Sequence, residues 1–288
     1  MFLTEDRFAV ETPQGPVFGT LHVPAQAKLA VLFIGGSGPH DRNGQSPNLH
    51  MGYDAWARAW GDRGLAILRL DKPGSGQSPL PTTRPARYAH DLIRNQAALD
   101  ALAQACPTLP LALIGHSLGA LTALELTHER LIGIAHLCGA GRTLDRVICD
   151  QVLTLLNHQK APQDAIEAHL AERLNVYQTF ARGEVLKDLP PWAGDDREAL
   201  IWIGDACRHD PVNLLNQCPL PLAMLMGTRD DRIYDLDWKM CRAATPKAPA
   251  LLVEGMDHFL KMPDGKLNHD ALNWIADQLL TNTSSHKV

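Results

Sequence analysis

Short runs of apolar residues recur along this chain, and stretches with helical periodicity separate most of them. A continuous apolar run of about four to eight residues, bounded by glycine or polar residues, is typical of a strand that is buried on both faces. Near the N-terminus, two alternating segments flank the stretch from Pro13 to Pro16 and predict a hairpin at one sheet edge. We expect strands over residues 7–10, 17–23, 29–34, 65–70, 111–114, 131–137, 221–227 and 250–253.

Between these strands, apolar residues recur every three or four positions, as in helices that pack one face on a core. Trp56 and Trp60 lie four residues apart on one such stretch, and we expect both in the core. Strands that alternate with helices predict an α/β fold, with a mostly parallel central sheet and right-handed crossovers. We expect helices over residues 52–63, 85–105, 235–244 and 266–280, with a further helix directly after Ser117.

The alternation stops between residues 142 and 216. This stretch has helical spacing and no convincing strand, so we predict a helical insertion over the carboxyl edge of the sheet. Acidic residues outnumber basic ones within it, which disfavours an anionic substrate because like charges repel. The predicted domains are an α/β core of residues 1–141 and 217–288 and the insertion 142–216, with helices over 143–158, 162–182 and 195–208.

Composition narrows the class of protein. The net charge of −5, without a cluster of lysine and arginine, predicts no nucleic-acid partner. The six cysteines form no Cys-x-x-Cys pair and are expected as buried apolar side chains in a reducing compartment. The N-terminus lacks the apolar core of a signal peptide, and no run of 18 apolar residues predicts a membrane span. We therefore expect a cytoplasmic protein.

The stretch from Leu111 to Glu125 has the pattern of a strand, a tight turn and a helix, with Gly115-His116-Ser117-Leu118-Gly119 at the turn. A serine on such a strained turn needs neighbours almost without side chains, which explains the two glycines. The turn exposes the hydroxyl at a helix N-terminus, where the Leu118 N–H faces a developing negative charge. We interpret Ser117 as a nucleophile and His116 as a packing residue.

A glycine-rich loop, residues 35–44, follows the strand predicted over 29–34. It lacks the Gly-Lys-Ser/Thr and Gly-x-Gly-x-x-Gly patterns that bind phosphates, and no helix begins directly after it. We interpret it as the loop that completes an oxyanion hole with a backbone N–H group, from Gly36 or Ser37. The residues expected to hold this loop by hydrogen bonds, without a chemical role, are Asp41, Arg42 and Asn43.

Residues suited to nucleophilic catalysis follow three of the predicted parallel strands: Ser117, then Asp230 or Asp231, then His258. Reactive groups in open parallel sheets gather at the carboxyl ends of the strands. A serine hydroxyl needs an imidazole to accept its proton, and the imidazole needs a carboxylate to orient it. The spacing of the 13 histidines matches no metal-binding motif, so we expect no metal.

Several segments resemble the serine α/β-hydrolase family. Gly36-Ser37-Gly38-Pro39 followed by Asp41-Arg42 resembles the family's His-Gly-Ser-Gly-Pro loop, except that Gly35 stands at the histidine position. The segment Asp71-Lys72-Pro73-Gly74-Ser75-Gly76-Gln77-Ser78 resembles the family's Asp-x-x-Gly-x-Gly-x-Ser pattern.

Two further segments resemble those that carry the family's acid and histidine. They are Gly227-x-x-Asp230-x-x-Ile233 and Gly255-Met256-Asp257-His258. The resemblance implies that Asp230 rather than Asp231 is the acid of a Ser-His-Asp triad. It also implies the α/β-hydrolase fold, with residues 142–216 as a helical cap.

The resemblance and the residue pattern together predict a serine hydrolase that acts on a carboxylic ester through an acyl-serine, without a cofactor. A small-molecule ester with an apolar acyl group is the expected substrate. A thioesterase, a serine peptidase or amidase, a C–C bond hydrolase and a non-catalytic binding protein of the same fold remain as alternatives. Aromatic residues of the insertion that could line an acyl pocket, although packing inside the cap is the simpler use, are Tyr177, Phe180, Trp192 and Trp202.

Overall fold

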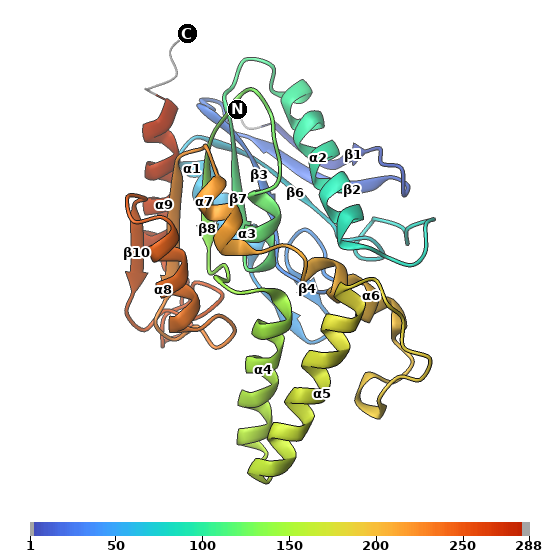
Figure 1. Ribbon diagram of the computed structural model, residues 1–288. Coiled ribbons are helices and arrows are strands. Elements are labelled where there is room, and N and C mark those ends of the chain that lie inside the picture. The colour runs from blue at the N-terminus through green and yellow to red at the C-terminus, as the bar shows by residue number, and fades with distance from the viewer. Residues whose placement is uncertain (1–2, 284–288) are drawn as a thin grey trace.

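An eight-stranded sheet forms the centre of the computed structural model, which describes residues 3–283 (Figure 1). The strand order is β1-β2-β6-β3-β7-β8-β9-β10. The strand β2 is antiparallel to both of its neighbours, and all pairs from β6 to β10 are parallel. The strands are β1 (Leu3–Val10), β2 (Val17–Val23), β3 (Leu29–Ile34), β6 (Leu65–Leu70), β7 (Leu111–His116), β8 (Leu131–Leu137), β9 (Leu222–Gly227) and β10 (Ala250–Val253). The predicted α/β fold with a mostly parallel sheet is confirmed.

The strand β3 shows why an uninterrupted apolar run is needed at the centre of this sheet. All six of its side chains are buried, and alternate residues belong to two different apolar clusters. Leu29, Val31 and Phe33 pack with Trp56 and Trp60, whereas the residues between them pack on the opposite face of the sheet. Both tryptophans are fully buried, as predicted.

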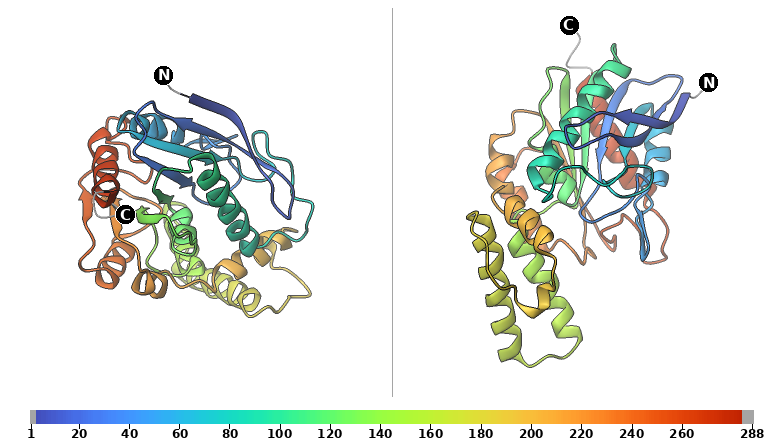
Figure 2. Two further views of the ribbon diagram at one scale, coloured as in Figure 1. Left: turned by 90° about the horizontal axis from the view of Figure 1, so that it is seen from above. Right: turned by 90° about the vertical axis from the view of Figure 1, so that its right-hand side faces the viewer.

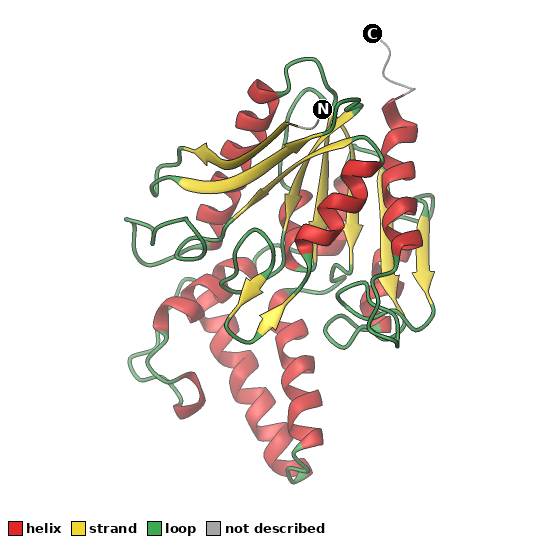
Figure 3. Cartoon of the chain, turned by 180° about the vertical axis from the view of Figure 1, so that it is seen from behind, coloured by secondary structure: helices red, strands yellow, loops and turns green. Residues whose placement is uncertain are grey.

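Helices cover both faces of the sheet (Figures 2 and 3). One face packs against α1 (Tyr53–Asp62) and α9 (His269–Thr283). The opposite face packs against α2 (Tyr88–Ala105), α3 (Leu118–Ala123) and α8 (Asp235–Ala244). No helix within residues 3–283 is both long and apolar enough to cross a membrane.

The predicted insertion is helical. The helices α4 (Leu144–His158) and α5 (Gln163–Ala181) form an antiparallel pair that projects away from the sheet (Figures 1 and 2). A short 3-10 turn (Pro191–Ala193) and α6 (Arg197–Ala206) follow. The last helix of this stretch, α7 (Pro211–Gln217), packs on α8, and its Leu215 is buried in the core cluster of the sheet.

Several elements differ from the prediction. A two-stranded hairpin of β4 (Gln45–Ser46) and β5 (Leu49–His50) occupies a stretch that we expected to be loop. The strand expected over 7–10 begins at Leu3, and the helix expected over 266–280 spans His269–Thr283. This helix begins late because the Asn268 side chain accepts the Ala271 N–H and caps it.

Candidate active site

Ser117 lies on a strained turn between β7 and α3. Its backbone has φ 56° and ψ −123°, a conformation that non-glycine residues rarely adopt. A Cβ atom on Gly115 would lie 2.3 Å from the Gly119 carbonyl oxygen, and one on Gly119 would lie 2.1 Å from the Ile34 carbonyl oxygen. Both glycines are therefore required by close packing, as the sequence pattern predicts.

Asp230 and His258 meet at the carboxyl ends of β9 and β10. The Nδ1 atom of His258 lies 2.9 and 2.8 Å from the two carboxylate oxygens of Asp230. Both side chains are almost fully buried, and the same carboxylate also accepts the backbone N–H groups of Arg232 and Ile233. Asp231 instead is exposed, and among the described residues its side chain forms an ion pair with Arg232 and none with His258. The structure therefore brings Asp230, and not Asp231, to the histidine.

The turn that carries Ser117 contacts this pair through the residue before the serine. The neighbouring His116 ring packs against the His258 ring at a centroid distance of 4.7 Å. Within residues 3–283, neither the Ser117 hydroxyl nor His258 Nε2 has a hydrogen-bond partner. Catalytic hydrogen bonds are often absent or long without substrate and form in the substrate complex.

A buried hydrogen-bond chain connects the glycine-rich loop, the turn and the histidine loop. The Gly36 N–H donates to the Tyr53 hydroxyl at 3.2 Å, and this hydroxyl lies 2.8 Å from His116 Nδ1. The Nε2 atom of His116 lies 2.9 Å from the His258 carbonyl oxygen. Burial holds the pKa of His116 well below its usual value, so its ring is neutral. Sequence reasoning missed Tyr53, because it lies 63 residues before its partner.

This chain of hydrogen bonds distinguishes Gly36 from Ser37 as candidate oxyanion donors. The Gly36 N–H is already engaged by Tyr53, whereas within the described residues the N–H groups of Ser37 and Leu118 donate to no protein acceptor. The loop also passes close to the turn, since a Cβ atom on Gly36 would lie 3.1 Å from the Ser117 Cβ atom.

The loop is braced as the sequence predicts. The guanidinium group of Arg42 forms a buried ion pair with Asp71 at 2.6 Å and also bonds to the Gly19 carbonyl oxygen. Asp41 accepts the backbone N–H groups of Asn43 and Gln45, both at 2.8 Å. These contacts fix the loop relative to β2 and β6.

Among the residues that the structure describes, one group of potential metal ligands is present, and it includes His258. The ligand atoms of His116, Cys138 and His258 all lie within 4.8 Å of one another. Both nitrogens of His116 already have hydrogen-bond partners, and burial raises the pKa of the Cys138 thiol well above its usual value. A protonated thiol and an engaged imidazole are poor metal ligands, so these residues do not fit a metal site.

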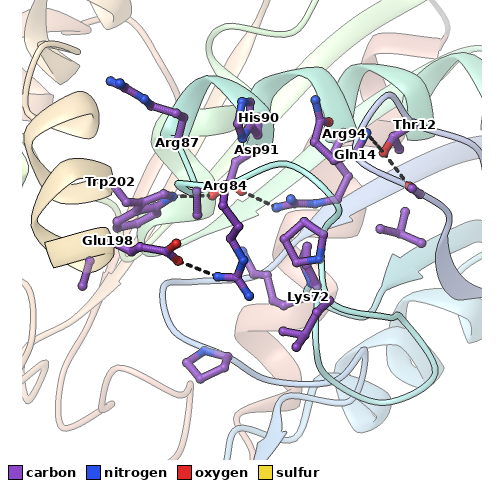
Figure 4. A pocket seen from close by; sticks show the side chains of 18 of the residues that line it. Thr12, Gln14, Lys72, Arg84, Arg87, His90, Asp91, Arg94, Glu198 and Trp202 are labelled. Carbon is purple, nitrogen blue, oxygen red and sulfur yellow. Dashed lines mark hydrogen bonds and ion pairs between the residues drawn. The ribbon is translucent and has the colours of Figure 1, made fainter. Parts of the chain in front are cut away.

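A cavity of about 450 Å³ lies beside the glycine-rich loop, between the core and α6 (Figure 4). Ser37, Gly38 and Pro39 line it from the loop, and Trp202 lines it from α6. Among the other aromatic residues of the insertion, Tyr177 and Phe180 are buried in its own apolar cluster, and Trp192 packs against that cluster.

Comparisons with known proteins agree with this fold. A profile of the alpha/beta hydrolase family matches residues 31–265. An esterase of Pyrococcus furiosus has a TM-score of 0.65 at 14% identity, over 98% of this chain and 92% of that chain. A thermophilic esterase of Thermogutta terrifontis has a TM-score of 0.60 at 15% identity, over 97% and 100% of the two chains. No curated protein sequence matches the chain.

Proposed function

Because this chain belongs to the alpha/beta hydrolase family, we propose that it is a serine hydrolase that cleaves a carboxylic ester through an acyl-serine. Ser117 is the nucleophile, His258 the general base and Asp230 the residue that orients the imidazole. The backbone N–H groups of Leu118 and Ser37 form the oxyanion hole. The engagement of the Gly36 N–H by Tyr53 favours Ser37 over Gly36 for this role.

In the proposed first step, the Ser117 oxygen attacks the ester carbonyl carbon while its proton passes to His258 Nε2. The carbonyl oxygen becomes an oxyanion that accepts hydrogen bonds from the two N–H groups. The alcohol then leaves with the proton from His258, and the acyl group stays on Ser117. Water, deprotonated by the same imidazole, attacks the acyl-serine and releases the acid.

The observation that carries the proposal is the contact between Asp230 and His258 beside the strained turn of Ser117. The carboxylate holds Nδ1 of the imidazole, so that the lone pair of Nε2 is left to accept a proton. This pairing is built from two distant loops and is buried, and a structural role would not require the unpartnered Nε2. We also assign residues 142–216 to a cap over this site, with the last helix, α7, packed on the core.

The test combines covalent labelling with turnover. We expect a fluorophosphonate to label Ser117, and we expect Ser117→Ala to lose labelling and at least about 10³-fold in ester turnover. The matched control is Ser75→Ala, in a neighbouring loop, which keeps both. A wild-type protein that is neither labelled nor active on a panel of p-nitrophenyl esters would contradict the proposal.

A matched set of an ester, a thioester and an amide with the same acyl group separates the remaining substrate classes. We expect the ester to have the highest kcat/KM. A higher value for the thioester or the amide would reassign the substrate while keeping the triad.

A further inference from the structure

The cavity beside the glycine-rich loop is mostly apolar. It reaches Ser37, whose N–H is one of the two proposed oxyanion donors, so a substrate bound at Ser117 can extend into it. Its walls come from core loops, from α2 and from α6, and ligand pockets often lie at such a boundary between two parts of a protein. Apolar residues that line it are Val17, Pro39, Leu80, Pro81, Trp202 and Ile203.

The carboxylates that line the cavity already have partners. Glu198 pairs with Arg84 at 2.5 Å, and Asp91 accepts hydrogen bonds from Arg94 at 2.7 Å and from the Trp202 indole at 3.1 Å (Figure 4). The third, Asp196, caps the N-terminus of α6 by accepting the Ala199 N–H. Of the two acidic residues of the insertion that line the cavity, Glu198 is therefore neutralised by Arg84, and Asp196 is held at the N-terminus of α6.

Lys72 is the exception among the cationic residues of the cavity wall. Within residues 3–283 its ammonium group forms no ion pair, and its one hydrogen bond is to the Gly35 carbonyl oxygen at 3.5 Å. Arg84 and Arg94 are paired as described, and Arg87 lies 4.0 Å from the Asp205 carboxylate. Burial lowers the pKa of Lys72 to about 8, since the attraction of the Asp91 carboxylate offsets only part of the burial and Arg94 repels the ammonium group.

We propose that Lys72 makes this site selective for an ester whose acyl group carries a carboxylate, such as a half-ester of a short dicarboxylic acid. The inference rests on the proposed function. The apolar walls hold the carbon chain, and the carboxylate gives the ammonium group an ion-pair partner of its own, whereas Asp91, the carboxylate that already attracts it, is bonded to Arg94 and Trp202. Because Lys72 contacts Gly35, the first residue of the glycine-rich loop and two residues before Ser37, the inference places the carboxylate only a few bonds from the ester carbonyl.

The experiment compares two esters that differ in one charge, p-nitrophenyl valerate and mono-p-nitrophenyl glutarate. We expect the wild-type kcat/KM to favour the charged ester. Lys72→Met keeps the apolar stem and is expected to reduce the ratio of charged to neutral turnover by about 10-fold or more, because a buried hydrogen bond to a charged group is lost. Lys72→Arg, which keeps the charge, retains part of the preference.

Lys239→Met is the matched control, since Lys239 is exposed on α8, and it keeps the wild-type ratio. Competitive inhibition by glutarate gives a second measure, which we expect to weaken in Lys72→Met in parallel with the ratio. A ratio that is equal in wild type and Lys72→Met overturns this inference and leaves the serine mechanism standing. A wild-type protein that hydrolyses neither ester, with Ser117 unlabelled, overturns both.

Discussion

The Tyr53 hydroxyl lies 2.8 Å from Nδ1 of His116, and this contact joins three loops of the site. The donor of each hydrogen bond between these loops follows from the chemistry of its partners. The Gly36 N–H donates to the Tyr53 oxygen, so the hydroxyl proton is directed to His116 Nδ1. The remaining ring proton is then on Nε2 and is donated to the His258 carbonyl oxygen. A neutral His116 thus links the glycine-rich loop to the loop of the proposed general base.

Tyr53→Phe removes this link while keeping the aromatic ring in the core. The Gly36 N–H and His116 Nδ1 then lose a buried partner, and we expect the free energy of unfolding to fall by about 1–3 kcal/mol. Because the proposed oxyanion donor and base lose their common support, kcat/KM on the preferred ester is expected to fall by roughly 10- to 100-fold. Urea unfolding and steady-state kinetics measure the two effects.

Tyr177→Phe is the matched control, because its hydroxyl also accepts a hydrogen bond, from Arg173, but within the insertion. We expect kcat/KM of the Tyr177→Phe variant to stay within about twofold of wild type. Equal kcat/KM values for Tyr53→Phe and Tyr177→Phe would show that the hydrogen bonds of Tyr53 have no part in positioning the site.

Gly35 stands where the His-Gly-Ser-Gly-Pro loop of the family has histidine. The structure gives a steric reason why a larger side chain does not fit at this position. A Cβ atom there would lie 2.8 Å from His40 Cε1 and 2.9 Å from Tyr53 Cε2. We expect Gly35→Ala to cost about 1–3 kcal/mol of stability through overpacking and Gly35→His to cost more. Thermal unfolding of Gly35→His against Gly35→His/His40→Gly checks the cause, because the second change frees space. A Gly35→His variant with an unchanged Tm would disprove this steric account.

Sequence reasoning succeeded where one local pattern determines the structure. The strand β3 was recognised because burial on both faces requires an uninterrupted apolar run, and the turn at Ser117 because crowding requires glycines at two fixed positions. The predicted hydrogen bonding of the glycine-rich loop by Asp41 is local in the same way, since its carboxylate accepts N–H groups two and four residues further on, whereas Arg42 holds the loop through Asp71, 29 residues away.

It failed where the structure depends on contacts between distant residues. The role of Tyr53 could not be read from its place on an apolar helix face, because its partners Gly36 and His116 belong to other segments. The sequence alone therefore does not distinguish Gly36 from Ser37 as the second proposed oxyanion donor. Apolar spacing also does not show where a helix starts, and α9 begins where the Asn268 side chain caps it.

The buried ion pair of Arg42 and Asp71 fixes the glycine-rich loop to the end of β6. Burial alone would raise the pKa of Asp71, but hydrogen bonds from Arg42 and backbone N–H groups lower it overall. Asp71→Leu leaves a guanidinium group buried without its partner, and we expect a loss of about 3–5 kcal/mol of stability. Arg42→Met/Asp71→Leu should lose less than the sum of the single changes in a double-mutant cycle of urea unfolding.

The exposed pair of Asp235 and Lys239 on α8 is the matched control for that cycle. Its two side chains are about 70% exposed, and Asp235→Asn is expected to cost less than about 1 kcal/mol. Equal costs for Asp71→Leu and Asp235→Asn would mean that the Arg42 contact does not stabilise the folded chain.

His136 gives a prediction about stability and pH. It is fully buried on β8, its Nε2 atom has no hydrogen-bond partner, and burial lowers its pKa to about 4. Below pH 6.5, the ordinary pKa of histidine, His136 therefore binds a proton in the unfolded chain but stays neutral in the folded chain until the pH approaches about 4. Proton uptake by His136 therefore lowers the free energy of unfolding progressively as the pH falls from about 6.5 to 4. Above about pH 6.5, the contribution of His136 to the free energy of unfolding does not change with pH.

Between pH 7 and pH 5 this single group should remove about 2 kcal/mol from the free energy of unfolding of the wild-type chain. His136→Gln cannot titrate, so its loss over the same interval is expected to be smaller by that amount, whatever the variant's stability at pH 7. Urea unfolding at both pH values measures the difference, with His50→Gln on the exposed β5 as the control that keeps the wild-type loss. If His136→Gln loses as much stability as wild type, proton uptake at His136 does not drive acid unfolding, and His116, whose pKa burial also lowers, becomes the group to test.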